Sequence, residues 1–226
     1  IDKEIYEKCG FDFQLLSFNR PGTGVLGKLK LPFQLLLPLW QSFQIIRKNK
    51  PHVIAACGGF GCLPLAWVAR FTSTPIVLLE QNAIPGRVNR HLASKAKFVF
   101  SEFKEAFSFF KTKAKLLHLG NPIRRDILKV DKTKPKNALL FMGGSQDSTK
   151  INDIAFEIIP EIIKTFPEMK IYHLTGKTLD EKYNQNEKYP QVKVLPFKDK
   201  MEEIYVEAKL VIGRSGATSI AEIAAL

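Results

Sequence analysis

The stretch that decides the fold is NALLFMGGSQDSTKIN, residues 137–152, in which an apolar run ends at two glycines before a helical pattern begins. After the turn, apolar residues recur at the spacing of one helix face, through Ile151, Ile154 and Ile158. A buried strand that passes through glycines into a helix leaves backbone N–H groups and the positive end of the helix dipole pointing outward. This arrangement suits a phosphate group, although a tight strand–helix turn without a ligand would give the same pattern.

The same rhythm repeats along the chain. Short β-rich runs alternate with amphipathic helical patterns, which is typical of parallel sheets with helices on both faces. Strands are expected at residues 11–18, 52–57, 75–81, 97–101, 137–144, 169–176, 192–197 and 209–216, and helices near 32–48, 63–70, 86–94, 150–166, 178–188 and 199–208, with a final helix after residue 216. Residues 115–137 lose the pattern and indicate a domain boundary. We therefore predict an α/β chain of two Rossmann-like domains, 1–121 and 122–226, facing each other across a cleft.

Composition and charge restrict the classes of function. The 226 residues are 45% hydrophobic, and no run approaches the roughly 20 apolar residues of a membrane span. Cys9, Cys57 and Cys62 show neither a disulfide framework nor zinc-ligand spacing, which fits a reducing cytoplasm. The net charge is +12, and residues 87–136 hold 14 Lys/Arg against 4 Asp/Glu. This excess indicates an anionic partner, whether a phosphorylated substrate, an anionic lipid surface or a nucleic acid, unless it is only a solvated basic face.

A second glycine turn, GRSGATSIAE at residues 213–222, carries a more specific signal. Gly216 follows a buried strand, and Glu222 lies one turn into the next helix. The first N–H groups of that helix suit a diphosphate, and a carboxylate on the same face can accept two hydrogen bonds from ribose hydroxyls. The pattern predicts a nucleotide-sugar site, although a helix capped by Thr218 or Ser219, with Glu222 complementing the dipole, would read alike. The chain has no dinucleotide fingerprint, no P-loop and no D-x-D pair that would hold a metal.

Six motifs together carry a family resemblance: GGFG (58–61), LLEQNAIPGRVNR (78–90), LGNPIRRD (119–126), FMGGSQ (141–146), YHLTGK (172–177) and RSGATSIAEIAA (214–225). In this order they resemble the MurG family of UDP-N-acetylglucosamine transferases, which convert lipid I to lipid II in bacterial peptidoglycan synthesis. The resemblance implies a GT-B fold and an inverting glycosyltransferase of cell wall biogenesis, cell shape and cell division. Its substrates would be UDP-N-acetylglucosamine and a lipid-linked muramyl-pentapeptide diphosphate, at the cytoplasmic face of the cell membrane. We expect no cofactor, no metal and no nucleic-acid partner.

The resemblance also implies a donor site in the C-terminal half. Its residues would be Arg124, the phosphate-proximal Ser145, Phe197, Lys198, Ala217, Thr218, Ser219 and Glu222. Phe197 and Lys198 are expected to clasp the uracil, and Glu222 is expected to bind the ribose. Thr218 and Ser219 are expected at the diphosphate.

For the N-terminal half, the resemblance implies contacts nearer the acceptor. Asn82 is expected to contact the donor sugar or the acceptor, with Glu80 and Gln81 beside it. Gly58 and Gly59 are expected at the acceptor diphosphate. The turn CGGFGCLPL has fewer glycines than is usual in the family, so this role is the least specific.

Two further departures concern the ends of the chain. The family's first glycine loop, with a histidine proposed near the acceptor hydroxyl, would precede Ile1, and its paired glutamines would follow Leu226. We therefore interpret the chain as a fragment in which no catalytic base is assigned, and we expect no sugar transfer by these 226 residues alone. His173 ends a strand near the predicted cleft, where a ligand contact and a structural role are both open.

Residues 27–50, GKLKLPFQLLLPLWQSFQIIRKNK, predict a membrane-docking helix. Phe33, Leu36, Leu37 and Trp40 follow helical spacing, and further apolar residues widen this surface beyond one core-facing stripe. Basic residues flank both ends, as in segments that bind anionic headgroups. Pro38 is expected to kink or split the helix. The alternative is that all of these apolar residues belong to the core.

Two other functions remain open from the sequence. Another UDP-sugar enzyme of the same fold, such as a UDP-N-acetylglucosamine epimerase or a lipid glycosyltransferase, would share most of these patterns. A nucleic-acid-binding α/β protein is suggested by the basic segment and by FKEAFSFFKTKAK at residues 103–115. However, Phe103, Phe107 and Phe110 fall at helical spacing, which is more often a core face than a stacking platform.

Overall fold

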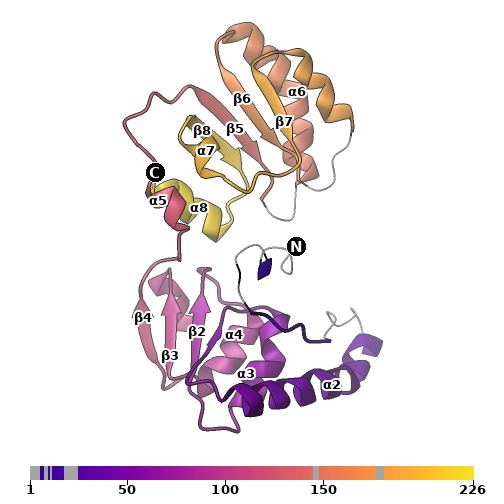
Figure 1. Ribbon diagram of the computed structural model, residues 1–226, viewed down its shortest axis with the longest axis vertical. Helices are drawn as coiled ribbons and strands as arrows, with labels where there is room; N and C mark the ends of the chain where they lie inside the picture. The colour runs from indigo at the N-terminus through magenta and orange to yellow at the C-terminus, as the bar shows by residue number, and fades with distance from the viewer. Residues whose placement is uncertain (1–5, 8–9, 11, 18–24, 145–147, 177–180) are drawn as a thin grey trace. The chain divides into compact units, whose positions relative to one another are not determined.

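The computed structural model describes residues 6–7, 10, 12–17, 25–144, 148–176 and 181–226. The chain divides into two compact units, Ile1–Gly120 and Asn121–Leu226 (Figure 1). The sequence predicted a boundary one residue later. Each unit has its own parallel sheet and its own clusters of buried apolar side chains.

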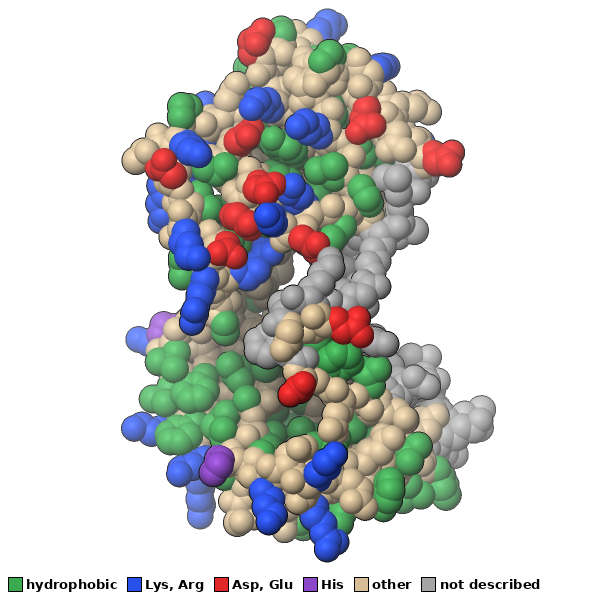
Figure 2. All heavy atoms as spheres, viewed as in Figure 1, with side chains coloured by type: hydrophobic (Ala, Val, Ile, Leu, Met, Phe, Trp, Pro, Cys, Tyr) green, Lys and Arg blue, Asp and Glu red, His purple; other side chains and the backbone are tan. Residues whose placement is uncertain are grey.

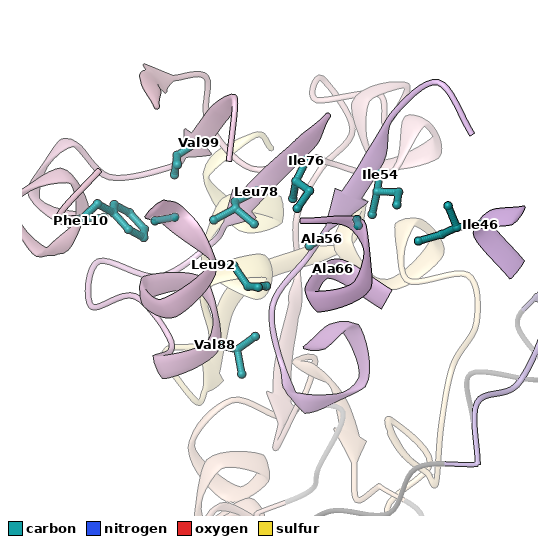
Figure 3. Close-up of a cluster of buried hydrophobic side chains, with 13 residues drawn as sticks. Ile46, Ile54, Ala56, Ala66, Ile76, Leu78, Val88, Leu92, Val99 and Phe110 are labelled. Carbon is teal, nitrogen blue, oxygen red and sulfur yellow. The ribbon is translucent and has the colours of Figure 1, made fainter. Parts of the chain in front are cut away.

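The first unit is built on a parallel sheet with the strand order β1-β2-β3-β4. Its strands are β1 (Ile54–Ala56), β2 (Ile76–Glu80), β3 (Phe98–Ser101) and β4 (Lys115–His118), and its helices are α2 (Val25–Asn49), α3 (Leu63–Ala69) and α4 (Arg87–Leu92). Because strand side chains alternate between faces, Ile76 and Leu78 of β2 point to the same side. Figure 3 shows them gathered with Ile54 and Val99 of neighbouring strands and with Leu92 of α4.

Helix α2 is one continuous helix, longer than the predicted range of residues 32–48, and Pro38 does not split it. The Pro38 carbonyl accepts a hydrogen bond from the Ser42 hydroxyl at 2.7 Å. Leu35, Ser42 and Ile46 are buried, so one face of α2 packs against the unit. The opposite face stays exposed.

One sequence expectation for this unit was wrong. The strand expected at residues 11–18 is absent from the described residues 12–17, which have no regular secondary structure. There the Ser17 N–H donates to the Gln41 side chain of α2 at 2.9 Å, so a helix side chain holds the segment instead of a sheet. The aromatic run after β3 forms a 3-10 helix, Lys104–Phe109, and Phe110 is buried as its spacing predicted.

The second unit has the strand order β7-β6-β5-β8, all parallel. Its strands are β5 (Ala138–Met142), β6 (Lys170–Leu174), β7 (Val192–Leu195) and β8 (Ala208–Gly213), and its helices are α5 (Arg125–Leu128), α6 (Thr149–Thr165), α7 (Glu202–Tyr205) and α8 (Ala217–Ala224). The predicted helix at 178–188 is a 3-10 helix, Glu181–Lys188, and the one at 199–208 is only the short α7. Every residue of β5 is buried, because apolar clusters cover both faces of this central strand.

The strand order reverses direction at β5. From β5 the chain proceeds outward through β6 to β7, and then returns to the other side of β5 as β8. The turns after β5 and β8 therefore lie at the same edge of the sheet, beside each other. A switch point of this kind, at the carboxyl ends of parallel strands, is where open α/β sheets bind ligands.

Candidate functional site

The candidate site of the second unit centres on Glu222, which is buried in the first turns of α8. Its two carboxylate oxygens accept hydrogen bonds from Arg124, with Nε to Oε1 at 2.7 Å and Nη2 to Oε2 at 3.0 Å. A bidentate pair of this kind fixes the carboxylate plane as well as its charge. The structure thus brings together two residues that the sequence placed separately at the donor.

Two neighbours complete the surroundings of this pair. The Arg124 Nη1 group donates to the Asp199 carbonyl at 3.2 Å, in the loop between β7 and α7. Tyr205 of α7 is buried, and its burial, with the charge of Glu222, raises its pKa to about 12. The Tyr205 phenol therefore stays protonated at neutral pH and can act as a hydrogen-bond donor there.

The amino end of α8 lacks a side-chain cap. Gly216 is the N-cap residue, in an extended conformation, and among the described residues no side-chain cap hydrogen bond is made there. Thr218 is exposed and Ser219 is half-buried, and both lie inside the helix after the N-cap residue, so neither takes the capping position that the alternative interpretation gave them. Ala217 is half-buried at the first helical position. The free N–H groups of this turn are available to an anion, as in phosphate sites at helix N-termini.

The amino end of α6, at the neighbouring turn, is capped by its own chain, because the Ser148 hydroxyl accepts from the Ile151 N–H at 3.4 Å. Gly144 precedes it with a φ of 80°. Ser145, expected near a phosphate, lies outside the described residues.

Of the two roles that the sequence left open for His173, a ligand contact and a structural role, its surroundings in the structure fit the structural one. It is fully buried in β6, where the Phe141 and Tyr183 rings meet it edge-on, and its Nε2 lies 3.3 Å from Asn152 Oδ1. Asn152 also donates to the Thr175 carbonyl at 2.8 Å. This pairing ties the first turn of α6 to the carboxyl end of β6. Burial lowers the pKa of His173 to about 4, so the imidazole is neutral.

Phe197 and Lys198, which were predicted to clasp the uracil, have different surroundings in the structure. Phe197 is 57% exposed, which leaves its ring free to stack. Lys198 instead forms an ion pair with Glu203 of α7 at 2.5 Å, and this lowers the pKa of Glu203. Their contacts with uracil stay a prediction.

In the first unit, Glu80 organises the loop that follows β2. It is buried, and Oε1 accepts from the Asn82 N–H at 3.0 Å and the Asn82 side-chain amide at 3.1 Å. Its other oxygen accepts from the Gly86 N–H at 3.1 Å and from Asn89 at 2.9 Å. Glu80 therefore acts on the loop itself, while Asn82 is exposed and Gln81 half-buried. Substrate contacts by these three residues stay predictions.

The glycine turn after β1 packs against Asn89 of α4. Gly58 and Gly59 have φ values of 86° and 76°, and a Cβ at Gly58 would lie 3.2 Å from Asn89 Nδ2. Packing therefore explains the glycine at position 58 without a ligand. The sequence did not single out Asn89, which bridges Glu80 and the Leu79 carbonyl. Asn89 lies two residues after Arg87 in the motif LLEQNAIPGRVNR, and its place in that motif is the sequence feature that could have pointed to it.

Within the described parts of the chain, no group of three or more His, Cys, Asp or Glu could hold a metal ion. No helix there is long and apolar enough to cross a membrane. The expectation that no cofactor or metal is needed stays untested.

Comparison with known proteins gives the class first. Residues 1–101 match the glycosyltransferase family 28 N-terminal domain, and residues 138–226 match the glycosyltransferase family 28 C-terminal domain. The chain is thus a glycosyltransferase family 28 protein.

Its relatives narrow this assignment. It is 35% identical over 234 residues to the UDP-N-acetylglucosamine--N-acetylmuramyl-(pentapeptide) pyrophosphoryl-undecaprenol N-acetylglucosamine transferase of Syntrophotalea carbinolica, and 36% identical over 248 residues to that of Halothermothrix orenii. All of this chain aligns, with 64% and 66% of those proteins. The chain belongs to the MurG family and spans about two thirds of the length of the curated relatives it matches.

Solved structures agree with the fold. MurG of Acinetobacter baumannii matches with a TM-score of 0.65 and 25% identity, covering 99% of this chain and 63% of that one. The S. aureus MnaA–UDP co-structure matches with a TM-score of 0.62 at 14% identity, covering 95% of this chain and 64% of that one, which shows the fold alone. The two parallel-sheet units and these neighbours establish the predicted α/β GT-B fold.

Proposed function

We propose that the protein, in its whole form, transfers N-acetylglucosamine from UDP to a lipid-linked muramyl-pentapeptide diphosphate in peptidoglycan synthesis. The observation that carries this proposal is the buried Glu222 carboxylate behind the uncapped amino end of α8. A carboxylate accepts hydrogen bonds from ribose hydroxyls, and free helix N–H groups donate hydrogen bonds to a diphosphate. The acceptor is inferred from the names of the aligned relatives, which are N-acetylmuramyl-(pentapeptide) pyrophosphoryl-undecaprenol N-acetylglucosamine transferases.

For this reaction, the second unit must bind UDP both as part of the donor and as the leaving group. An acceptor hydroxyl gives its proton to a general base and attacks the anomeric carbon while the bond to the UDP oxygen breaks, so negative charge grows on the diphosphate. The α8 N–H groups at Ala217, Thr218 and Ser219 would stabilise that charge in place. Arg124 neutralises Glu222, so the ribose-binding carboxylate does not repel the departing UDP.

Calorimetry with UDP, UDP-N-acetylglucosamine and UDP-glucose tests this function. We expect UDP and UDP-N-acetylglucosamine to bind, and Glu222→Ala to weaken both by about 1 to 3 kcal/mol, the cost of losing a charge-assisted hydrogen-bond partner. Glu207→Ala is the matched control, because Glu207 is also ion-paired, with Lys170, but precedes β8 at the opposite end of the strand. Equal UDP affinity in the wild type and in Glu222→Ala would contradict the assignment.

We further propose that α2 docks the protein on an anionic membrane at the cytoplasmic face, where a lipid-linked acceptor keeps its diphosphate. Phe33 is 76% exposed, Leu36 64%, Leu37 52% and Trp40 60%. Figure 2 shows hydrophobic side chains gathered over this helix, at the lower right of the view. We call these four residues the α2 patch.

The charge around the α2 patch supports the same proposal. Arg47, Lys48 and Lys50 are exposed at the carboxyl end of the helix. Basic side chains beside an apolar helical face contribute about 1 kcal/mol each at an anionic surface. An apolar surface rimmed by basic residues is thus suited to lipid headgroups.

A further inference from the structure

Arg124 joins three segments of the second unit that are far apart in the sequence. It lies just before α5, and its guanidinium reaches α8 through Glu222 and the β7–α7 loop through the Asp199 carbonyl. Three of its five N–H groups are engaged in these bonds. Glu222 is 98 residues further along the chain and Asp199 is 75.

The bond geometry leaves Glu222 able to bind a ligand while it is held. A carboxylate has about four lone-pair directions, and the two bonds from Arg124 use one on each oxygen. The remaining lone pairs can accept the two ribose hydroxyls. Without Arg124, a carboxylate that is only 7% exposed would lack its counter-charge and its fixed orientation.

We propose that Arg124 is a positioning residue for the uridine end of the donor site: it orients Glu222 toward the ribose and fixes the Asp199 carbonyl beside the predicted uracil loop. Its effect on the donor passes through these two groups and not through a bond to the diphosphate. This inference rests on the proposed function and revises the direct donor contact expected from the sequence.

The test compares ligands that differ by one group: uridine, UDP and 2′-deoxy-UDP, titrated by nuclear magnetic resonance into the full chain. In Arg124→Ala we expect uridine and UDP to weaken by the same factor, on the order of tenfold or more. The preference for UDP over 2′-deoxy-UDP should fall to near one. The double variant with Glu222→Ala should bind no more weakly than Glu222→Ala alone, because both changes remove one interaction.

Two further variants keep the test decisive. Arg124→Lys retains the charge but not the planar fork, so it should also lose discrimination against 2′-deoxy-UDP, even if Arg124→Ala fails to fold. Arg125→Ala removes an exposed arginine from the next position and should change nothing.

The outcomes separate this inference from the function beneath it. A loss confined to UDP, with uridine binding unchanged, would show a diphosphate contact and overturn the positioning role. Additive losses in the double variant would do the same. A wild-type chain that binds none of the three ligands would overturn the proposed function, and this inference with it.

Discussion

His173 makes the stability of the second unit depend on pH, because its pKa is about 4 in the folded chain against 6.5 for an unperturbed histidine. Between these two pH values, His173 is protonated in the unfolded chain but not in the folded chain. The free energy of unfolding therefore falls as the pH falls from 6.5 to 4. The difference amounts to about 3 kcal/mol. His173→Gln should remove this part of the slope, measured as urea unfolding at several pH values.

The control for this prediction is His91→Gln, which changes an exposed histidine in the other unit. It should leave the dependence unchanged. If His173→Gln and the wild type lose stability in parallel below pH 6.5, the imidazole is protonated in the fold and its neutral burial is contradicted.

Sequence patterns located the candidate site but not its bonds. A glycine turn and helix periodicity placed Glu222 at the donor, since both signals are local, whereas Arg124 was placed there by the family resemblance. Their mutual pairing depends on chain segments 98 residues apart. Asn89 and Asn152 were missed for a similar reason: each amide bonds to groups from other segments, and no spacing rule marks it.

At the scale of elements, the α2 patch makes the sharpest prediction. Replacing Leu36 and Trp40 together with Glu puts two charges where apolar side chains would enter the headgroup region, and both positions are already exposed. We expect co-sedimentation with vesicles containing anionic lipid to fall on the order of tenfold or more. Neutral vesicles should bind the wild type less, and added salt should weaken binding to the anionic ones.

A matched control for this change exists on α6, where Ile154 is 52% exposed and Ile158 36%. Replacing both with Glu makes the same change of charge and apolarity in the other unit. If this control loses vesicle binding as strongly as the α2 variant, net charge and not the α2 patch governs docking. Unchanged binding by the folded α2 variant would rule the patch out.

Elements were predictable where apolar periodicity was long, and least so where tertiary contacts decide. The 17 residues of α6 and the buried β5 follow from their patterns. Residues 12–17 have a strand-like composition, but the Ser17 N–H at the end of this segment bonds to the Gln41 side chain of α2 and not to a strand. In α2, burial of Pro38 and Ser42 against the unit outweighs the disruption expected from a proline within a helix.

At the scale of the whole molecule, each unit has a core of its own, so each can unfold in its own transition. Both tryptophans, Trp40 and Trp67, belong to the first unit, and their fluorescence therefore reports only that unit. Calorimetry reports both units. The two methods together separate the transitions without any substitution.

UDP should stabilise the second unit alone, because it lacks the sugar that Asn82 of the first unit is expected to contact. At a UDP concentration 100 times its dissociation constant, the free energy of unfolding rises by about 2.7 kcal/mol. For a domain of this size, that raises the melting temperature by roughly ten degrees or more. We expect one calorimetric transition to shift while the fluorescence transition stays in place.

Inorganic diphosphate is the control, since it can occupy helix N-termini but offers Glu222 no ribose hydroxyls, and it should shift the calorimetric transition less. An equal UDP-induced shift in both signals would contradict this prediction: it would mean either that the two units unfold together or that the nucleotide site is not confined to residues 121–226.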